Sequence, residues 1–170
     1  IDALVSVSAN DGTEAPIALD LCAGSGAIAL ALANEVPNAR VWAIEKSPEA
    51  HAWASRNVAR LGEGRVQLLL GDVAQARQLL EPLLGRVHML VSNPPYVPTG
   101  MVPRDPEVRD HDPELALYGG ADGLDLVRVI SRVGLDFVIP GGVLVLEHAE
   151  LQGDLIRAIL AADGWLTPAT

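Results

Sequence analysis

The chain has 170 residues, 49% of them hydrophobic and 4% aromatic, with a formal net charge of −10 and a pI of about 4.7. This length and apolar content predict one domain with one substantial core. The negative charge disfavours a domain that holds nucleic acid by its own surface, because phosphate binding requires a basic face. The single cysteine excludes an internal disulfide and a cysteine metal cluster. With no long apolar run and no signal-peptide pattern, we expect a cytoplasmic monomer that has no resident metal and no contact with a membrane.

Strand-like and helix-like patterns alternate along the chain. Apolar runs predict strands at 17–22, 41–45, 66–70, 87–92 and 142–147. Helical patterns follow them at 27–35, 48–61, 74–84, 123–138 and 151–162. Strands that are apolar throughout and separated by helices predict a parallel sheet covered on both faces. The expected fold is therefore α/β, Rossmann-like and doubly wound, and one more strand or hairpin is expected beyond Trp165.

Polar residues follow the first three predicted strands where each strand ends. The first strand runs into a glycine turn, the second ends at Glu45, 19 residues after Gly26, and the third ends before Asp72 and Val73. In a doubly wound fold, such a turn lets the backbone and a helix N-terminus approach a ligand, and the next carboxylate accepts from ribose hydroxyls. We therefore predict a cofactor site at Asp20, Cys22, Ala23, Gly24, Ser25, Gly26, Glu45, Asp72, Val73 and, after the fourth strand, Asn93.

Other interpretations of these residues stay open at this point. The glycine turn alone also fits the GxGxxG/A pattern of nicotinamide and flavin enzymes. Asp20 and Asp72 could serve as helix caps, and Cys22 could be a small buried residue, since nothing near it favours a reactive thiolate.

The tetrad Asn93-Pro94-Pro95-Tyr96 follows the fourth predicted strand and opens a loop, residues 93–122, that contains six prolines. Prolines keep their carbonyl oxygens but lack N–H groups, so this corner is stiff and rich in acceptors. The Asn93 side chain adds another acceptor oxygen, and Tyr96 adds a flat face. We predict that Asn93, Pro94 and Tyr96 are catalytic and that the whole tetrad binds a substrate –NH2 group. The loop residues 99–118 are either a lid or a passive excursion.

Four strand ends that contribute in order to one crevice resemble the class I methyltransferases that use S-adenosylmethionine. Longer segments resemble the release-factor glutamine methyltransferases, the HemK/PrmC family. These segments are residues 20–62, GDV at 71–73, SNPPYVP, ALYGGADGLDLVRVI and GGVLVLEHAELQGDLI. The resemblance implies methylation of the side-chain amide nitrogen of a glutamine in the Gly-Gly-Gln loop of bacterial peptide-chain release factors. It also implies that Cys22–Gly26, Glu45, Val73 and Asn93 touch the cofactor and that Asn93–Tyr96 hold the glutamine.

The sequence departs from the family pattern at three positions. The family usually has Gly where Cys22 stands, Asp where Glu45 stands and often Trp where Val73 stands. The family's N-terminal helical domain and terminal strand pair are also missing from this sequence, so residues 1–170 are expected to be a catalytic domain. The leading alternative is an amino-methyltransferase acting on adenine or guanine of DNA or RNA, because the same tetrad suits a flipped base. An inactive cofactor-binding module or a nicotinamide enzyme is the other alternative.

Overall fold

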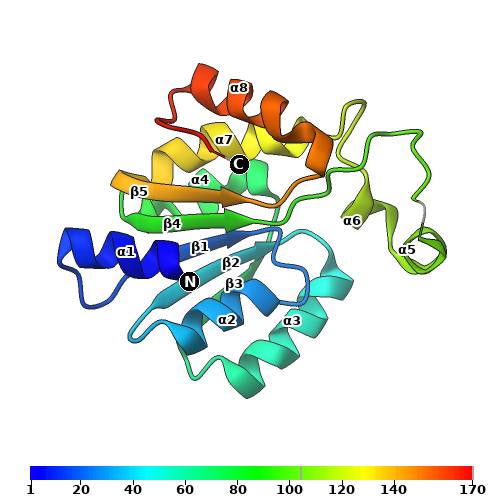
Figure 1. Ribbon diagram of the computed structural model, residues 1–170. Coiled ribbons are helices and arrows are strands. Elements are labelled where there is room, and N and C mark those ends of the chain that lie inside the picture. The colour runs from blue at the N-terminus through cyan, green and yellow to red at the C-terminus, as the bar shows by residue number, and fades with distance from the viewer. Residues whose placement is uncertain (104, 170) are drawn as a thin grey trace. The chain divides into compact units, whose positions relative to one another are not determined.

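The computed structural model describes residues 1–103 and 105–169. The described residues contain one parallel sheet of five strands in the order β3-β2-β1-β4-β5 (Figure 1). The strands are β1 (Ile17–Leu21), β2 (Arg40–Glu45), β3 (Val66–Leu70), β4 (Val87–Ser92) and β5 (Val138–Leu146). This order confirms the predicted doubly wound fold. The chain reverses direction across the sheet between β1 and β4, and in such sheets ligands bind beyond the carboxyl ends of the strands at that reversal.

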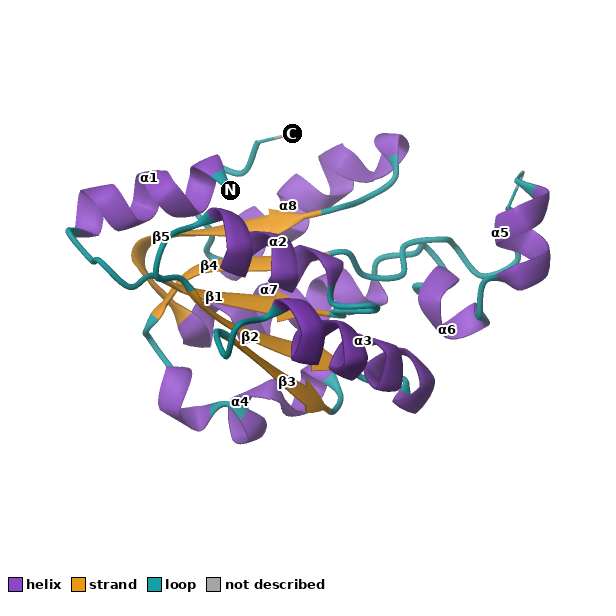
Figure 2. Cartoon of the chain, turned by 90° about the horizontal axis from the view of Figure 1, so that it is seen from below, coloured by secondary structure: helices purple, strands orange, loops and turns teal. Residues whose placement is uncertain are grey.

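Helices connect the strands. The longer ones are α1 (Asp2–Asp11), α2 (Ala27–Glu35), α3 (Pro48–Leu61), α7 (Asp125–Phe137) and α8 (Gly153–Asp163), and the short ones are α4 (Ala76–Leu79), α5 (Pro106–His111) and α6 (Glu114–Leu117). Single 3₁₀ turns lie at η1 (Val73–Gln75), η2 (Glu81–Leu83) and η3 (Glu150–Gln152). Figure 2 shows α1, α2 and α3 on one face of the sheet. No helix in the described ranges is long and apolar enough to cross a membrane.

The chain divides into two compact units, Ile1–Ser92 with Val133–Leu146 and Asn93–Arg132 with Glu147–Thr170. The first unit contains the sheet and a core that is rich in small side chains, with Ala18, Ala29, Ala33, Ala39 and Ala43 all fully buried. Alanines at these positions let α2 lie close against β1 and β2, because no long side chain separates the backbones. The close approach fixes the N-terminus of α2 just beyond the end of β1.

Several elements differ from the sequence prediction. Helix α1 was not predicted; it ends at Gly12, whose φ of 74° suits glycine. The helix predicted at 74–84 is broken into short turns around Pro82. Strand β5 begins at Val138 instead of residue 142. The 93–122 loop contains α5, for which Asp105 accepts a capping hydrogen bond from the Glu107 N–H (2.9 Å).

Candidate active site

The glycine turn after β1 exposes backbone beside open space. Gly24 and Gly26 have φ values of 56° and 81°, and a Cβ added at Gly24 would meet no atom of residues 1–103 or 105–169 within 4 Å. The turn is held at its ends, because the Ala23 N–H donates to the Ile44 carbonyl (3.0 Å) and the Asn57 side chain donates to the Ser25 carbonyl (3.0 Å). The first turn of a helix also leaves its leading N–H groups without intrahelical partners. The turn therefore combines fixed ends with a backbone that a ligand can approach.

Asp20 lies beneath this turn and is fully buried. Its Oδ2 accepts a hydrogen bond from the Ala29 N–H in the first turn of α2 (3.1 Å), while its Oδ1 is buried and has no partner among the residues that the structure describes. Burial raises the pKa of Asp20 to about 7, the hydrogen bond from Ala29 opposes this shift, and the nearby Glu45 charge adds to it. Because Gly26 at the N-cap of α2 has no side chain, Asp20 anchors the helix instead.

Glu45, at the end of β2, binds the backbone of two separate segments, the glycine turn after β1 and the start of α3. One carboxylate oxygen accepts from the Gly24 N–H and the other from the Ser47 N–H, each at 2.7 Å. A carboxylate has about four acceptor positions, so these two bonds leave capacity for ligand hydroxyls. The Glu45 side chain thereby joins the glycine turn to the start of α3.

Cys22 takes the left-handed conformation that favours glycine, with a φ of 68°. Burial raises the pKa of its thiol to about 12 against a weaker opposing hydrogen bond from Ser92. The thiol therefore stays protonated near neutral pH and is a poor nucleophile. Cys22 is therefore an unreactive residue, although its side chain is half-buried and not fully buried as the sequence suggested.

We predict that Cys22→Gly stabilises the protein by up to ~1 kcal/mol. A non-glycine residue in the left-handed region costs about 1–2 kcal/mol, and the greater freedom of glycine in the unfolded chain offsets part of that gain. The free energy of unfolding in urea measures the difference. Cys22→Ala is the matched control, because it removes the thiol but keeps the Cβ. An equal gain in the alanine variant would show that strain at residue 22 is not the cause.

Asp72 lies where β3 ends and is partnered on two sides. Its Oδ1 accepts from the Ala74 N–H (2.9 Å), and its Oδ2 lies 2.8 Å from the Lys46 Nζ. The Lys46 ammonium, and then the Ala74 hydrogen bond, lower the pKa of Asp72, so the carboxylate is ionised at neutral pH. The adjacent Val73 side chain is buried. Lys46 was not predicted from the sequence, although its position directly after Glu45 is a signal that could have found it.

The tetrad begins the second compact unit, directly after β4. Pro94 is buried, whereas Asn93 is exposed, and within the described residues neither the Asn93 side chain nor the Pro94 carbonyl forms a hydrogen bond. Both acceptors are therefore free for a ligand. Burial, and then the Glu147 carboxylate, raise the pKa of the Tyr96 hydroxyl, which stays protonated near neutral pH.

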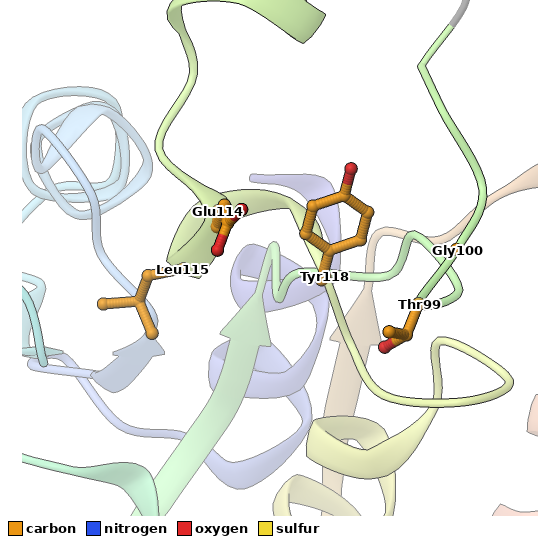
Figure 3. Close-up of a pocket in the computed structure, with 5 residues that line it drawn as sticks. All are labelled: Thr99, Gly100, Glu114, Leu115 and Tyr118. Atoms are coloured by element: carbon orange, nitrogen blue, oxygen red, sulfur yellow. The ribbon is translucent and has the colours of Figure 1, made fainter.

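A hollow of about 600 Å³ lies in the loop that follows the tetrad. Figure 3 shows the Tyr118 ring between Glu114 and Leu115 on one side and Thr99 and Gly100 on the other. A bridge between Val97 and Tyr118 joins the two chain segments that form it. All of them lie within residues 99–118, for which the sequence left a lid and a passive excursion open, but the hollow itself was not predicted because the two segments are 14 or more residues apart.

Two histidines have structural partners. The Nδ1 of the buried His88 accepts from the Ile17 N–H (3.1 Å), so its Nε2–H faces the Asp11 carboxylate (3.1 Å) at the amino end of the sheet. His148 has its Nδ1 2.8 Å from the Ala149 carbonyl. Among the described residues no group of three or more His, Cys, Asp or Glu side chains could hold a metal ion.

The first unit therefore brings nine of the ten predicted cofactor residues to the carboxyl ends of β1, β2 and β3. They are Asp20, Cys22, Ala23, Gly24, Ser25, Gly26, Glu45, Asp72 and Val73. The tenth, Asn93, follows the last residue of β4 and belongs to the second unit. Hydrogen bonds link several members directly, as from Gly24 to Glu45. Their contact with a ligand stays a prediction.

Comparison with known proteins shows that the chain is similar to methyltransferases. Residues 18–93 match the family model of a methyltransferase domain. The chain is 49% identical over 170 residues to the release factor glutamine methyltransferase of Streptomyces coelicolor, covering 98% of this chain and 58% of that protein. It is 44% identical over 153 residues to a 4-amino-L-phenylalanine/4-methylamino-L-phenylalanine methyltransferase of Streptomyces pristinaespiralis, covering 90% of this chain and 50% of that protein.

Solved structures share the fold. A predicted O-methyltransferase from Agrobacterium tumefaciens has a TM-score of 0.61 at 24% identity, over 92% of this chain and 65% of that one. Aeropyrum pernix fibrillarin, in complex with natively bound S-adenosyl-L-methionine, has a TM-score of 0.60 at 14% identity, over 94% of this chain and 64% of that one. At these identities the likeness concerns the fold alone.

The sheet order, the glycine turn and the matching family model define a class I methyltransferase domain. In sequence the chain is similar to release factor glutamine methyltransferases, several of which are 36–49% identical to it over most of its length. The chain spans about half the length of the curated relatives it matches.

Proposed function

We propose that this chain transfers a methyl group from S-adenosylmethionine to the side-chain amide nitrogen of the glutamine in the Gly-Gly-Gln motif of peptide-chain release factors. The observation that carries the proposal is the pair of unengaged acceptors at Asn93 and Pro94, directly after β4 of a methyltransferase fold. The similarity to release factor glutamine methyltransferases supports the choice of a protein glutamine.

The residues at the strand ends fit the proposed cofactor. The open space beside Gly24 admits a ligand against the backbone, and the spare acceptor positions of Glu45 suit ribose hydroxyls. Asp72 presents an ionised carboxylate next to Val73, where a carboxylate and a backbone N–H suit an adenine edge. When bound, S-adenosylmethionine supplies an electrophilic methyl group on a sulfonium. We propose that the ten predicted residues hold this cofactor. Asp20 contributes indirectly, because it anchors the start of α2 through the Ala29 N–H.

The tetrad performs the proposed substrate chemistry by positioning. An amide nitrogen is a poor nucleophile, because its lone pair is delocalised into the carbonyl. The Asn93 Oδ1 and the Pro94 carbonyl accept the two N–H groups of the glutamine, which holds the nitrogen and favours a pyramidal geometry. The ring of Tyr96 packs against the planar amide, and its protonated hydroxyl adds no charge there. Forming the N–CH3 bond would break the S–CH3 bond and leave S-adenosylhomocysteine. The nitrogen proton becomes acidic once the new bond forms and passes to water, so no strong base is required.

The acidic surface is consistent with a protein partner that presents basic surface. The net charge of −10 opposes direct binding of DNA or RNA phosphates and favours positively charged polypeptide. The hollow formed by Thr99, Gly100, Glu114, Leu115 and Tyr118 offers the segment that flanks the glutamine one carboxylate and two apolar surfaces. Release factors act in translation, so the proposed location is the cytoplasm.

A second candidate substrate is an aromatic amine on a free amino acid. The observation that favours it is the 44% identity to the methyltransferase named for 4-amino-L-phenylalanine. An aromatic amine also has a delocalised nitrogen lone pair and two N–H groups, so the same two acceptors would suit it. Asn93 and Pro94 therefore support the reaction type, and the rest of the substrate decides between the two.

Transfer of a labelled methyl group to a purified release factor tests the proposal. We expect label on the wild-type factor and none on a factor whose Gly-Gly-Gln glutamine is replaced by alanine. Parallel reactions contain 4-amino-L-phenylalanine, tRNA or DNA. Label on the small amine alone would support the second candidate, and label on nucleic acid alone would overturn both.

A further inference from the structure

Gln152 links three separate parts of the second compact unit. The residue ends η3 and is 7% exposed. Its Nε2 donates to the Tyr96 carbonyl (2.9 Å) and to the Asp122 carbonyl (3.2 Å), and its Oε1 accepts from the Ala149 N–H (3.1 Å). Both N–H groups of the amide and its oxygen are thus engaged. A buried side chain with all of these bonds formed fixes the segments that it joins.

Glycines in the segment 119–123 pack backbone against backbone on the tetrad. A Cβ added at Gly119 would overlap the carbonyl oxygen of Pro95. A Cβ added at Gly123, where φ is 77°, would overlap the carbonyl oxygen of Tyr96. Beyond the tetrad, the Gly119 N–H donates to the Val97 carbonyl (2.9 Å). The glycines are needed here because no side chain fits between the two backbones.

The Asp122 carbonyl that receives Gln152 is itself held in place. The Asp122 carboxylate accepts from the Leu124 N–H (3.0 Å) and pairs with the Arg128 guanidinium (2.5 Å). The Arg128 guanidinium, and then the Leu124 N–H, lower the pKa of Asp122 to about 2, so the pair persists at neutral pH. This ion pair is exposed and therefore adds little stability, but it defines the turn.

We infer that Gln152 is a positioning residue for methyl transfer, because it occupies the Tyr96 carbonyl and fixes the backbone that presents Asn93 and Pro94. The inference rests on the proposed function of the tetrad. Of the tetrad carbonyls, that of Tyr96 is engaged by Gln152, while that of Pro94 is free. Gln152 thus determines which carbonyl oxygens are available to a substrate –NH2 group and holds them at a fixed orientation.

The variant Gln152→Glu tests this role. Ionised glutamate keeps the acceptor for Ala149 but places negative charge against two carbonyl oxygens. We expect kcat for methyl transfer to fall at least tenfold at pH 8, with the Kd for S-adenosylmethionine, measured by calorimetry, within threefold of wild type. Gln78→Glu, the same change on exposed α4, is the matched control and should retain wild-type kcat.

The pH profile separates positioning from general destabilisation. A buried carboxyl beside carbonyl oxygens has a raised pKa, and its protonated form donates one hydrogen bond. We expect the ratio of variant to wild-type kcat to rise as the pH falls from 8 to 6. Taking the ratio removes titration of groups that both proteins share, among them Tyr96, Asp122, Glu147 and His148. A ratio that stays constant would contradict the inference, as would wild-type kcat at pH 8.

Amide hydrogen exchange gives a readout that does not depend on activity. We expect the Val97 and Gly119 amides, which bond within this segment, to exchange at least tenfold faster in Gln152→Glu at pH 8, while Leu19 in β1 is unchanged. Unchanged exchange at Val97 would overturn the inference. A wild-type chain that methylates no glutamine would instead contradict the proposed function and leave this measurement valid. If Gln152→Glu does not fold at pH 8, Gln152→Met replaces it in both measurements, because it removes both donors at the same length.

Discussion

Asn93→Ala should reduce the rate of methyl transfer by about 10²-fold or more, while the affinity for S-adenosylmethionine changes only a few-fold. A rate loss of this order is expected when one preorganised hydrogen-bonding group is removed from a reacting centre. The Asn93 side chain is exposed and forms no hydrogen bond within the described residues, so its removal costs the fold little. The substrate –NH2 group instead loses one of its two hydrogen-bond acceptors and keeps only the Pro94 carbonyl. Single-turnover transfer of a labelled methyl group measures the rate, and calorimetry measures the cofactor affinity.

The control for Asn93→Ala is Asn34→Ala, which removes an exposed asparagine from α2. We expect its rate to equal that of wild type. If Asn93→Ala bound no cofactor, Asn93 would be mainly a cofactor or structural residue. If its transfer rate were unchanged, the tetrad would not hold the substrate nitrogen by this side chain.

The central strands β1 and β4 were the most predictable, because they are buried at nearly every residue inside a parallel sheet. Such strands read as continuous apolar runs, and β4, for example, is buried at every residue from Val87 to Ser92. The start of α3 was equally readable, since the Ser47 hydroxyl accepts from the Ala50 N–H (3.2 Å) as an N-cap before Pro48. A cap of this kind involves only neighbouring residues, so the sequence alone is enough to predict it.

Elements that depend on tertiary packing were less predictable. Helix α1 has no side-chain cap at its start, and its two buried residues, Leu4 and Val7, give only a weak helical pattern. The start of β5 was missed because Pro140 and the two following glycines resemble a turn, yet a register irregularity opposite β4 accommodates them. Pairing with a neighbouring strand decides this segment, and the segment alone does not contain that information.

The strand-end residues of the candidate site could be located from the sequence, but their partners could not. Parallel strands bring Asp20, Glu45 and Asp72 to one edge of the sheet, as predicted. Gln152 differs, because its bond to the Tyr96 carbonyl spans 56 residues along the chain. The motif that contains Gln152 was visible in the sequence, whereas its role required the fold.

The wild-type protein should become less stable as the pH rises from about 4 to about 7, because Asp20 is buried. The variant Asp20→Asn should not show this loss. Burial raises the pKa of Asp20 from 3.8 to about 7, so over this range the folded protein keeps a proton that the unfolded chain releases. The favourable contribution is complete below pH 4 and is lost progressively up to pH 7, because the unfolded state binds fewer protons. At ~1.4 kcal/mol per pH unit, the loss between pH 5 and pH 8 is about 2–3 kcal/mol.

Asparagine at position 20 should reduce the dependence of the free energy of unfolding on pH, because its side chain does not titrate. Its amide oxygen can still accept from the Ala29 N–H, so α2 keeps its anchor. We expect the free energy of unfolding of Asp20→Asn, relative to wild type, to rise by about 2–3 kcal/mol between pH 5 and pH 8 in urea titrations. Glu14→Gln, which removes one exposed carboxylate, controls for the change in net charge. A constant difference across the pH range would mean that Asp20 is ionised in the folded protein at pH 5, in which case its buried Oδ1 must have a partner such as an ordered water.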